Sequence, residues 1–113
     1  MTVPTPLHIR LLNLLGAIRD LSPFDVLTAE EKQLLGSLIV RWHDHDNIAV
    51  SHVMRDLASV SQTTIYRRLI SLRDKGFVRL RTDAADKRTK FVEPTPLSDS
   101  YAAQITKALG QIF

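Results

Sequence analysis

The fold is decided by residues 61–81, which read SQTTIYRRLISLRDKGFVRLR. Ser61 is a preferred helix N-cap, and the apolar residues after it recur at the spacing of one helical face. Those residues are Ile65, Leu69, Ile70 and Leu72. Gly76 predicts the end of the helix, since glycine readily adopts the left-handed conformation found after a helix. From Phe77 onward, apolar residues alternate with arginines at the period of a half-buried strand.

A shorter helix is expected just before this one, with Ser51 as its N-cap. Its apolar side chains are Val53, Met54, Leu57 and Ala58. Two short helices about three residues apart, each opened by a serine, are typical of a helix-turn-helix. The apolar run Ile48–Val50 in front of them predicts a short edge strand.

A β-hairpin with a charged tip is predicted directly after the helix pair. The segment Thr82–Asp86 is polar and turn-prone. Phe91 and Val92 begin a second strand, and Pro94 and Pro96 terminate it. A hairpin that directly follows a helix-turn-helix is called a wing, and we use that name for this predicted hairpin.

The N-terminal segment Leu7–Leu21 predicts a helix that is apolar over more than one face. Ser22 and Pro23 are expected to end it. Because such a helix must be covered, we expect it to pack on its own domain and to meet the same helix of a second subunit.

Two further helices have recognisable N-termini. Thr28 and Glu31 form a capping box, with Leu27 at the hydrophobic staple position. The core side of that helix is expected to consist of Leu34, Leu35, Leu38, Ile39 and Trp42. Either Thr95 or Ser98 is expected to cap the last helix of the chain.

Together these elements predict a mostly α protein with a small β-hairpin, a winged helix-turn-helix flanked by N- and C-terminal helices. Residues 1–113 are expected to form a single DNA-binding domain. It would consist of an N-terminal dimerisation helix (7–21), a winged-helix core (28–95) and a C-terminal helix (96–113).

The positive charge of the chain is concentrated in one window. The sequence has 15 Lys and Arg against 12 Asp and Glu, a formal net charge of +3. Between Arg55 and Lys90, ten basic residues face four acidic ones, so this window carries +6 and the remainder −3. A locally positive surface is what phosphate binding requires, because the attraction comes from the local field.

Several classes of protein are excluded or disfavoured. The chain has no cysteine, which rules out disulfides, thiol catalysis and zinc-thiolate sites. No nucleophile elbow or glycine-rich phosphate loop supports an enzyme. We expect neither a membrane span nor a signal peptide, and therefore a cytoplasmic protein. We also expect no cofactor.

The helix from Ser61 and the hairpin supply the candidate DNA-binding residues. Short hydroxyls, an amide and arginines suit base edges and phosphates in the major groove. On the helix the candidates are Ser61, Gln62, Thr63, Thr64, Tyr66, Arg67 and Arg68. On the wing they are Lys87, Arg88 and Lys90, whereas Arg79 and Arg81 are expected to meet phosphate or solvent.

At these residues the sequence resembles the MarR-type winged-helix regulators, over roughly Leu27 to Thr95. That family's wing has Asp-x-Arg, three residues, a β-branched apolar residue and a Leu-Thr pair two positions on. Here Asp86, Arg88, Val92 and Thr95 match, whereas Pro94 departs from the usual leucine. The resemblance implies that Arg88 enters the minor groove and that Asp86 orients it. It also implies a homodimer bound to double-stranded DNA, and an effector that would be a small molecule.

By the same resemblance the chain is a short member of the family. Family members have a longer C-terminal region, whose two helices help dimerisation and form a ligand crevice. This chain ends about 15 residues after Ser98, which puts a typical phenolic-ligand pocket in doubt.

Two alternatives stay open at the level of sequence. A winged-helix module that binds protein would keep the fold without the basic surface, and a DNA-binding protein of replication or plasmid maintenance would share the whole pattern. His43, His45 and His52 lie close in sequence, but His43 and His45 point apart on a helix, so a polar loop is favoured over a metal site.

Overall fold

The computed structural model describes residues 4–57 and 60–112, which form two compact units. Residues Leu27–Asp99 form the first, which we name the winged-helix unit. The described parts of 1–26 and 100–113 form the second, which we name the flanking unit. The grouping of these units into one DNA-binding domain stays a prediction.

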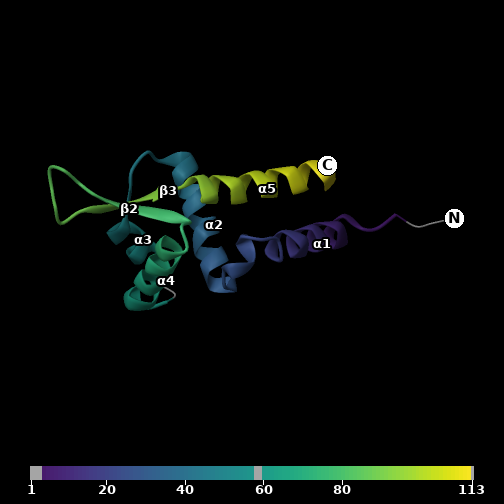
Figure 1. The fold of residues 1–113 in the computed structure, drawn as a ribbon, viewed down its shortest axis with the longest axis horizontal. Coiled ribbons are helices and arrows are strands. Elements are labelled where there is room, and N and C mark those ends of the chain that lie inside the picture. The colour runs from purple at the N-terminus through teal and green to yellow at the C-terminus, as the bar shows by residue number, and fades with distance from the viewer. Residues whose placement is uncertain (1–3, 58–59, 113) are drawn as a thin grey trace. The chain divides into compact units, whose positions relative to one another are not determined.

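The winged-helix unit contains a helix-turn-helix and a three-stranded antiparallel sheet (Figure 1). The strand order in the sheet is β1-β3-β2, so the hairpin strand β3 is central. The elements are α2 (Ala29–Asp44), β1 (Ile48–Ala49), α3 (Val50–Asp56), α4 (Gln62–Asp74), β2 (Val78–Thr82) and β3 (Lys90–Pro94). The winged helix-turn-helix predicted from the sequence is therefore confirmed.

The core of this unit is built from the predicted helical faces. Ile65, Leu69 and Leu72 of α4 are buried, and α4 packs against α2. Across the sheet, Val78 and Val92 are buried on the same side. Other buried side chains of the unit are Leu34, Leu35, Leu38, Val53 and Phe77.

The capping box at the start of α2 is present as predicted. Thr28 Oγ1 accepts from the Glu31 backbone N–H at 3.1 Å, and Glu31 Oε1 accepts from the Thr28 N–H at 2.9 Å. Leu27, at the staple position, is buried. These bonds satisfy two of the amides that a helix N-terminus leaves without backbone partners.

The start of α3 differs from the prediction. The helix begins at Val50, its N-cap is Ala49, and no side chain caps it, so Ser51 as the cap is wrong. Ala49 pairs with Phe91 in the sheet and is already extended, so the chain turns into the helix at the next residue. The strand therefore ends before Val50, and Ala58 lies outside the described residues.

The passage from α4 to β2 is a Schellman motif at Gly76. Gly76 has φ 89°, its N–H donates to Arg73 O at 2.9 Å, and the Phe77 N–H donates to Leu72 O at 2.9 Å. Phe77 and Leu72 are both fully buried, which supplies the apolar contact typical of this motif. The predicted helix stop is confirmed, and it aims the chain from α4 directly into the wing.

The last helix, α5 (Pro96–Ile112), begins in the winged-helix unit and continues into the flanking unit. Of the two predicted caps, Thr95 takes the position before the helix. Its Oγ1 accepts from the Ser98 N–H at 3.3 Å, and Ser98 Oγ accepts from the Thr95 N–H at 2.8 Å.

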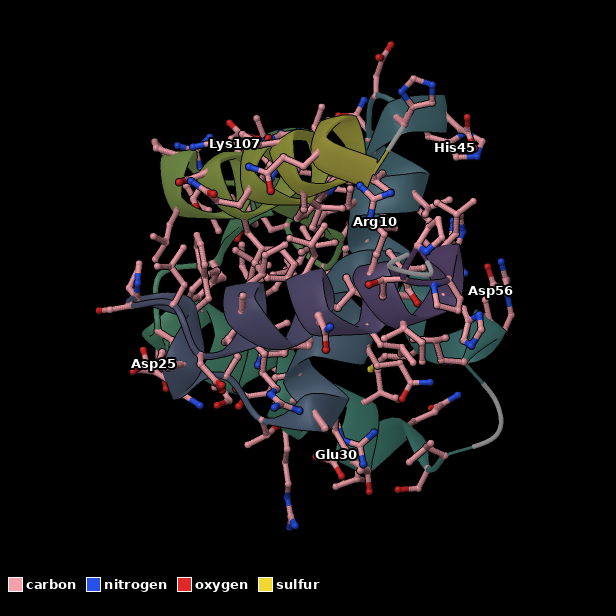
Figure 2. The ribbon with its side chains drawn as sticks, turned by 90° about the vertical axis from the view of Figure 1, so that its right-hand side faces the viewer. Arg10, Asp25, Glu30, His45, Asp56 and Lys107 are labelled. Carbon is pink, nitrogen blue, oxygen red and sulfur yellow. The ribbon has the colours of Figure 1, made fainter. Side chains whose placement is uncertain are left out.

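The flanking unit pairs α1 (Leu7–Arg19) with the later turns of α5. α1 ends two residues before the predicted Leu21, and a short 3-10 helix, η1 (Phe24–Val26), follows it. Arg10, which Figure 2 labels on α1, donates to Gln111 O at 3.1 Å, and the ring centroids of Phe24 and Tyr101 lie 5.1 Å apart in an edge-on arrangement. Of the residues in α1, all of which the structure describes, only Ile18 is buried. Among the described residues, no helix has the length and apolar character to cross a membrane.

Candidate nucleic-acid interface

The first turn of α4 uses two of the predicted DNA-binding side chains for its own cap. Ser61 Oγ accepts from the Thr64 N–H at 3.2 Å, which confirms Ser61 as the N-cap. The hydroxyls of Ser61 and Thr64 lie 2.7 Å apart and are hydrogen-bonded to each other. Both therefore have an internal partner before any ligand arrives.

The next predicted residues of α4 form one exposed face. Gln62, Thr63, Tyr66 and Arg67 are all exposed, including 38% of Tyr66. Gln62, Thr63 and Tyr66 line an open groove with Met54 of α3, with a volume of about 260 Å³. This face offers an amide, two hydroxyls and a guanidinium at the N-terminal end of the helix.

Arg68 lies on a different flank of α4. It is half-buried and lines a pocket of about 90 Å³ with residues of α2, among them Glu30, Leu34 and Ser37. The groove that contains Gln62 and Tyr66 does not include Arg68. Arg68 therefore lies apart from the residues that line this groove.

The wing turn is organised by Asp86. Its Oδ1 accepts from the Arg88 N–H at 3.1 Å, and its Oδ2 accepts from Thr89 Oγ1 at 3.0 Å. Thr89 also joins the base of the turn, because its carbonyl accepts from the Asp83 N–H at 2.9 Å. The carboxylate of Asp86 thus fixes the backbone of the turn, a role typical of aspartate in such turns.

The side chain of Arg88 projects from this turn almost entirely into solvent. It is 97% exposed, and its Nε lies 3.8 Å from Asp86 Oδ1. An exposed pair at this distance contributes little to stability, so the guanidinium is free to meet another anion.

The basic residues of the Arg55–Lys90 window divide into two groups. Among the residues that the structure describes, Arg67, Arg68, Lys87 and Lys90 have no ion-pair partner, and all of them lie on α4 or at the wing. Lys75, in contrast, forms an ion pair with Glu31, in which Nζ lies 2.6 Å from Oε1. The unpaired cations of this window therefore lie where the sequence predicts contact with DNA.

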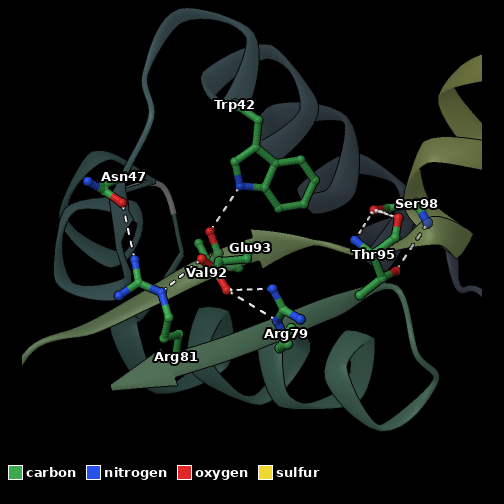
Figure 3. A network of polar contacts seen from close by, with 8 residues as sticks. All are labelled: Trp42, Asn47, Arg79, Arg81, Val92, Glu93, Thr95 and Ser98. Carbon is green, nitrogen blue, oxygen red and sulfur yellow. Dashed lines mark hydrogen bonds and ion pairs between the residues drawn. The ribbon is translucent and has the colours of Figure 1, made fainter. Parts of the chain in front are cut away.

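Arg79 and Arg81 have internal partners that the sequence did not reveal. Both donate to Glu93, and Arg81 also donates to Asn47 (Figure 3). Their side chains still meet solvent, at 70% and 44% exposure, and their contact with phosphate stays a prediction. The hydrogen bond from Arg81, reinforced by the one from Arg79, lowers the pKa of Glu93. The reason is local: residues 79, 81 and 93 lie on one face of the hairpin, opposite the buried Val78 and Val92.

Glu31 is a structural residue whose distant partners the sequence did not reveal. Besides its place in the capping box, it accepts from Ser71 Oγ and from Lys75 Nζ, both at 2.6 Å. Burial alone would raise the pKa of this carboxyl, but the hydrogen bonds from Lys75, Ser71 and Thr28 outweigh burial and lower it to about 2. Glu31 thereby ties the start of α2 to the end of α4.

The histidines do not gather into a metal site in the described part of the chain. Within residues 4–57 and 60–112, no group of three or more His, Asp or Glu side chains is arranged to hold a metal ion. His43, His45 and His52 are all exposed.

Solved structures of known proteins share this architecture. A mutant of MepR from S. aureus has a TM-score of 0.67 at 22% identity, with 93% of this chain and 71% of that chain covered. The S. aureus MepR–DNA complex has a TM-score of 0.65 at 19% identity, with 93% and 77% covered. A mutant of MarR from E. coli complexed with operator DNA has a TM-score of 0.62 at 21% identity, with 92% and 71% covered.

No family model and no curated protein matches the chain. The likeness is therefore one of structure, and it shows that the chain has the winged helix-turn-helix fold of the MarR-type regulators, as its sequence predicts.

Proposed function

We propose that this chain, which has the MarR-type fold, is a sequence-specific DNA-binding transcriptional regulator. The observation that carries the proposal is the grouping of unpaired cations with exposed polar side chains on α4 and the wing. Two of the similar structures, MepR and MarR, were solved with DNA, which supports the same ligand class here.

In the proposed complex, α4 enters the major groove with its N-terminal turns first. Gln62, Thr63, Tyr66 and Arg67 would face base edges or phosphates, because amides and guanidinium groups match the donor and acceptor pattern of that groove. Ser61, Thr64 and Arg68 would contribute from the rim of this face. The wing would lie at the minor groove with Arg88 inserted and with Lys87 and Lys90 beside phosphates, while Asp86 holds the turn.

The active form in this proposal is a homodimer. A two-fold dimer would present two copies of α4 about one helical turn apart, ~34 Å, to a pseudo-palindromic operator. The exposed leucines of α1 are the surface through which we expect the two chains to meet.

The ligand class is tested by titrating a labelled random DNA duplex at increasing salt. We expect Lys87→Ala to weaken binding on every sequence and to reduce the slope of log K against log salt by ~1, because one phosphate contact is lost. Lys107→Ala is the matched control, an exposed lysine of α5 whose loss changes the net charge equally. If the wild-type chain binds no random duplex at low salt, the proposal is overturned and a protein-binding winged helix takes its place.

Recognition of the DNA base sequence is tested separately, by selecting bound duplexes from a pool of randomised sequences. Gln62→Ala should relax the preference at one base position, with a loss of ~1–3 kcal/mol on the best site, since a base contact discriminates where a phosphate contact does not. An equal loss on all sequences would reduce Gln62 to a backbone contact.

A further inference from the structure

One carboxylate on the outward face of the wing hairpin holds two arginines. Arg79 donates to Glu93 Oε1 from Nε at 3.1 Å and from Nη2 at 3.0 Å, whereas Arg81 Nε donates to Oε2 at 2.9 Å (Figure 3). Both oxygens of Glu93 are therefore occupied. The three side chains together carry a net charge of +1, although two cations are present.

Arg81 is held by two further contacts. Its Nη2 donates to Asn47 Oδ1 at 3.2 Å, and its guanidinium carbon lies 4.8 Å from the centre of the Phe91 ring. Charge-assisted hydrogen bonds and stacking on an aromatic ring are favourable contacts of a guanidinium. Arg81 would lose all of these contacts if it turned toward a phosphate.

The cations in the turn of the wing and at the start of β3 are not held in this way. Lys87 and Lys90 have no ion pair among the described residues, and Arg88 is 97% exposed. The two arginines of β2 are thus paired with Glu93, whereas Lys87, Arg88 and Lys90 are available.

We propose, building on the proposed function, that Glu93 limits the sequence-independent affinity of this protein for DNA by withholding Arg79 and Arg81 from phosphates. Sequence-independent binding grows with the number of phosphates that Lys and Arg neutralise. Restricting the available cations to α4 and the wing tip lowers that affinity without removing a base contact. Glu93 is in this sense a specificity-determining residue that need not touch DNA.

Release of the two arginines is feasible because neither is buried. The side chain of Arg79 is 70% exposed and that of Arg81 is 44% exposed, on the strand that leads into the wing. Without the negative charge of Glu93, both guanidinium groups would be repelled by each other and available to a nearby phosphate.

The test is the variant Glu93→Gln, measured on a random duplex and on a selected site across a salt series. We expect tighter binding to random duplex, a salt slope steeper by ~1–2, and a smaller ratio of specific to random affinity. Asp99→Asn is the matched control: it removes one exposed negative charge that forms no ion pair among the described residues, so it reports the effect of net charge alone. Adding Arg79→Gln and Arg81→Gln to Glu93→Gln should return the slope to the wild-type value.

Two outcomes overturn the proposal. One is a Glu93→Gln protein that binds random duplex no better than Asp99→Asn does. The other is a folded Glu93→Gln protein that binds every duplex more weakly, which would make Glu93 a brace for the wing. If Glu93→Gln does not fold, Arg79→Gln is compared with Lys107→Ala, an exposed site that loses the same charge. Withholding predicts equal affinity of the two variants for random duplex, and a larger loss in Arg79→Gln contradicts it.

Failure of the proposed function gives a different result. In that case the wild-type chain binds neither duplex at low salt, and the comparison of variants is not reached. A wild-type chain that binds DNA, with no gain in Glu93→Gln, contradicts the role of Glu93 only.

Discussion

At the scale of single residues, a strongly lowered pKa belongs to Glu31, a carboxylate outside the proposed DNA-binding surface. Glu31 is buried at 3% exposure and receives hydrogen bonds from Thr28, Ser71 and Lys75. A buried carboxylate is tolerated only when it is paired and fully hydrogen-bonded, and Glu31 meets both conditions.

Glu31 predicts a specific acid sensitivity. Because its pKa in the folded protein is about 2, below the usual 4.5, its stabilisation is complete above about pH 5 and is lost as the pH falls toward 2. Glu31→Gln should lower the free energy of unfolding at pH 7 by about 2–3 kcal/mol and remove this part of the acid dependence. Urea unfolding at pH 7 and at pH 3 measures both effects.

Glu30→Gln is the matched control for that prediction. Glu30 is the exposed neighbour of Glu31, and its carboxylate has no ion pair among the residues that the structure describes. We expect a change within about 0.5 kcal/mol, as for most surface substitutions. Equal losses in the two variants would show that the network around Glu31 is not what stabilises the protein.

At the scale of elements, the junction between α4 and β2 fixes how the wing leaves the helix. Gly76 adopts a positive φ that L residues rarely adopt, and the Schellman bonds around it depend on that conformation. A side chain at this position would be strained even though a Cβ would meet Leu97 at an ordinary 3.6 Å.

Two glycines therefore predict opposite effects of the same substitution. Gly76→Ala should destabilise the protein by about 1–2 kcal/mol through its φ. Gly36→Ala should stabilise it by about 0.5–1 kcal/mol, because Gly36 lies within α2 and a Cβ there meets nothing within 4 Å. Thermal unfolding of the two variants beside the wild type checks both signs, and a stabilised Gly76→Ala would contradict the cap.

Elements were predictable from the sequence where their signals are local. The caps at Thr28 and Ser61 and the stop at Gly76 involve residues within a few positions of each other, and all three are present. The start of α3 was missed because a distant partner decides it: Ala49 is extended by pairing with Phe91, which overrides the local preference of Ser51.

The candidate site shows the same limit. The distribution of charged residues and the spacing of apolar residues identified α4 and the wing as the basic surface. They could not show which cations are free of an internal partner. The partners of Lys75 and of Arg79 are Glu31 and Glu93, which lie 44 and 14 positions away and reach them through the packing of helices and strands. Likewise, the engagement of the Ser61 and Thr64 hydroxyls with each other follows from side-chain geometry.

At the scale of the whole molecule, the flanking unit leaves an apolar surface uncovered. Its exposed side chains on α1 include Leu7 at 54%, Leu12 at 61% and Leu15 at 42%. Contiguous exposed apolar side chains mark interaction surfaces, which supports the proposed homodimer.

Light scattering checks the dimer and its surface. We expect the wild-type chain to be a dimer and Leu12→Glu to be a monomer, because a charge there would be buried without a partner. Val40→Glu is the control: Val40 is 64% exposed on α2 in the winged-helix unit, and the variant should remain dimeric. A monomeric wild type at micromolar concentration, or a monomeric Val40→Glu, would contradict α1 as the interface.

The hydrogen bond from Trp42 Nε1 to Val92 O, 3.0 Å long, has a practical consequence. Trp42 is the one tryptophan in the sequence. It lies near the end of α2 and is half-buried against β3, the central strand from which the wing extends. All tryptophan emission of this protein therefore originates in the winged-helix unit. An unlabelled sample carries its own optical probe of whether the end of α2 stays docked on the hairpin when DNA is added.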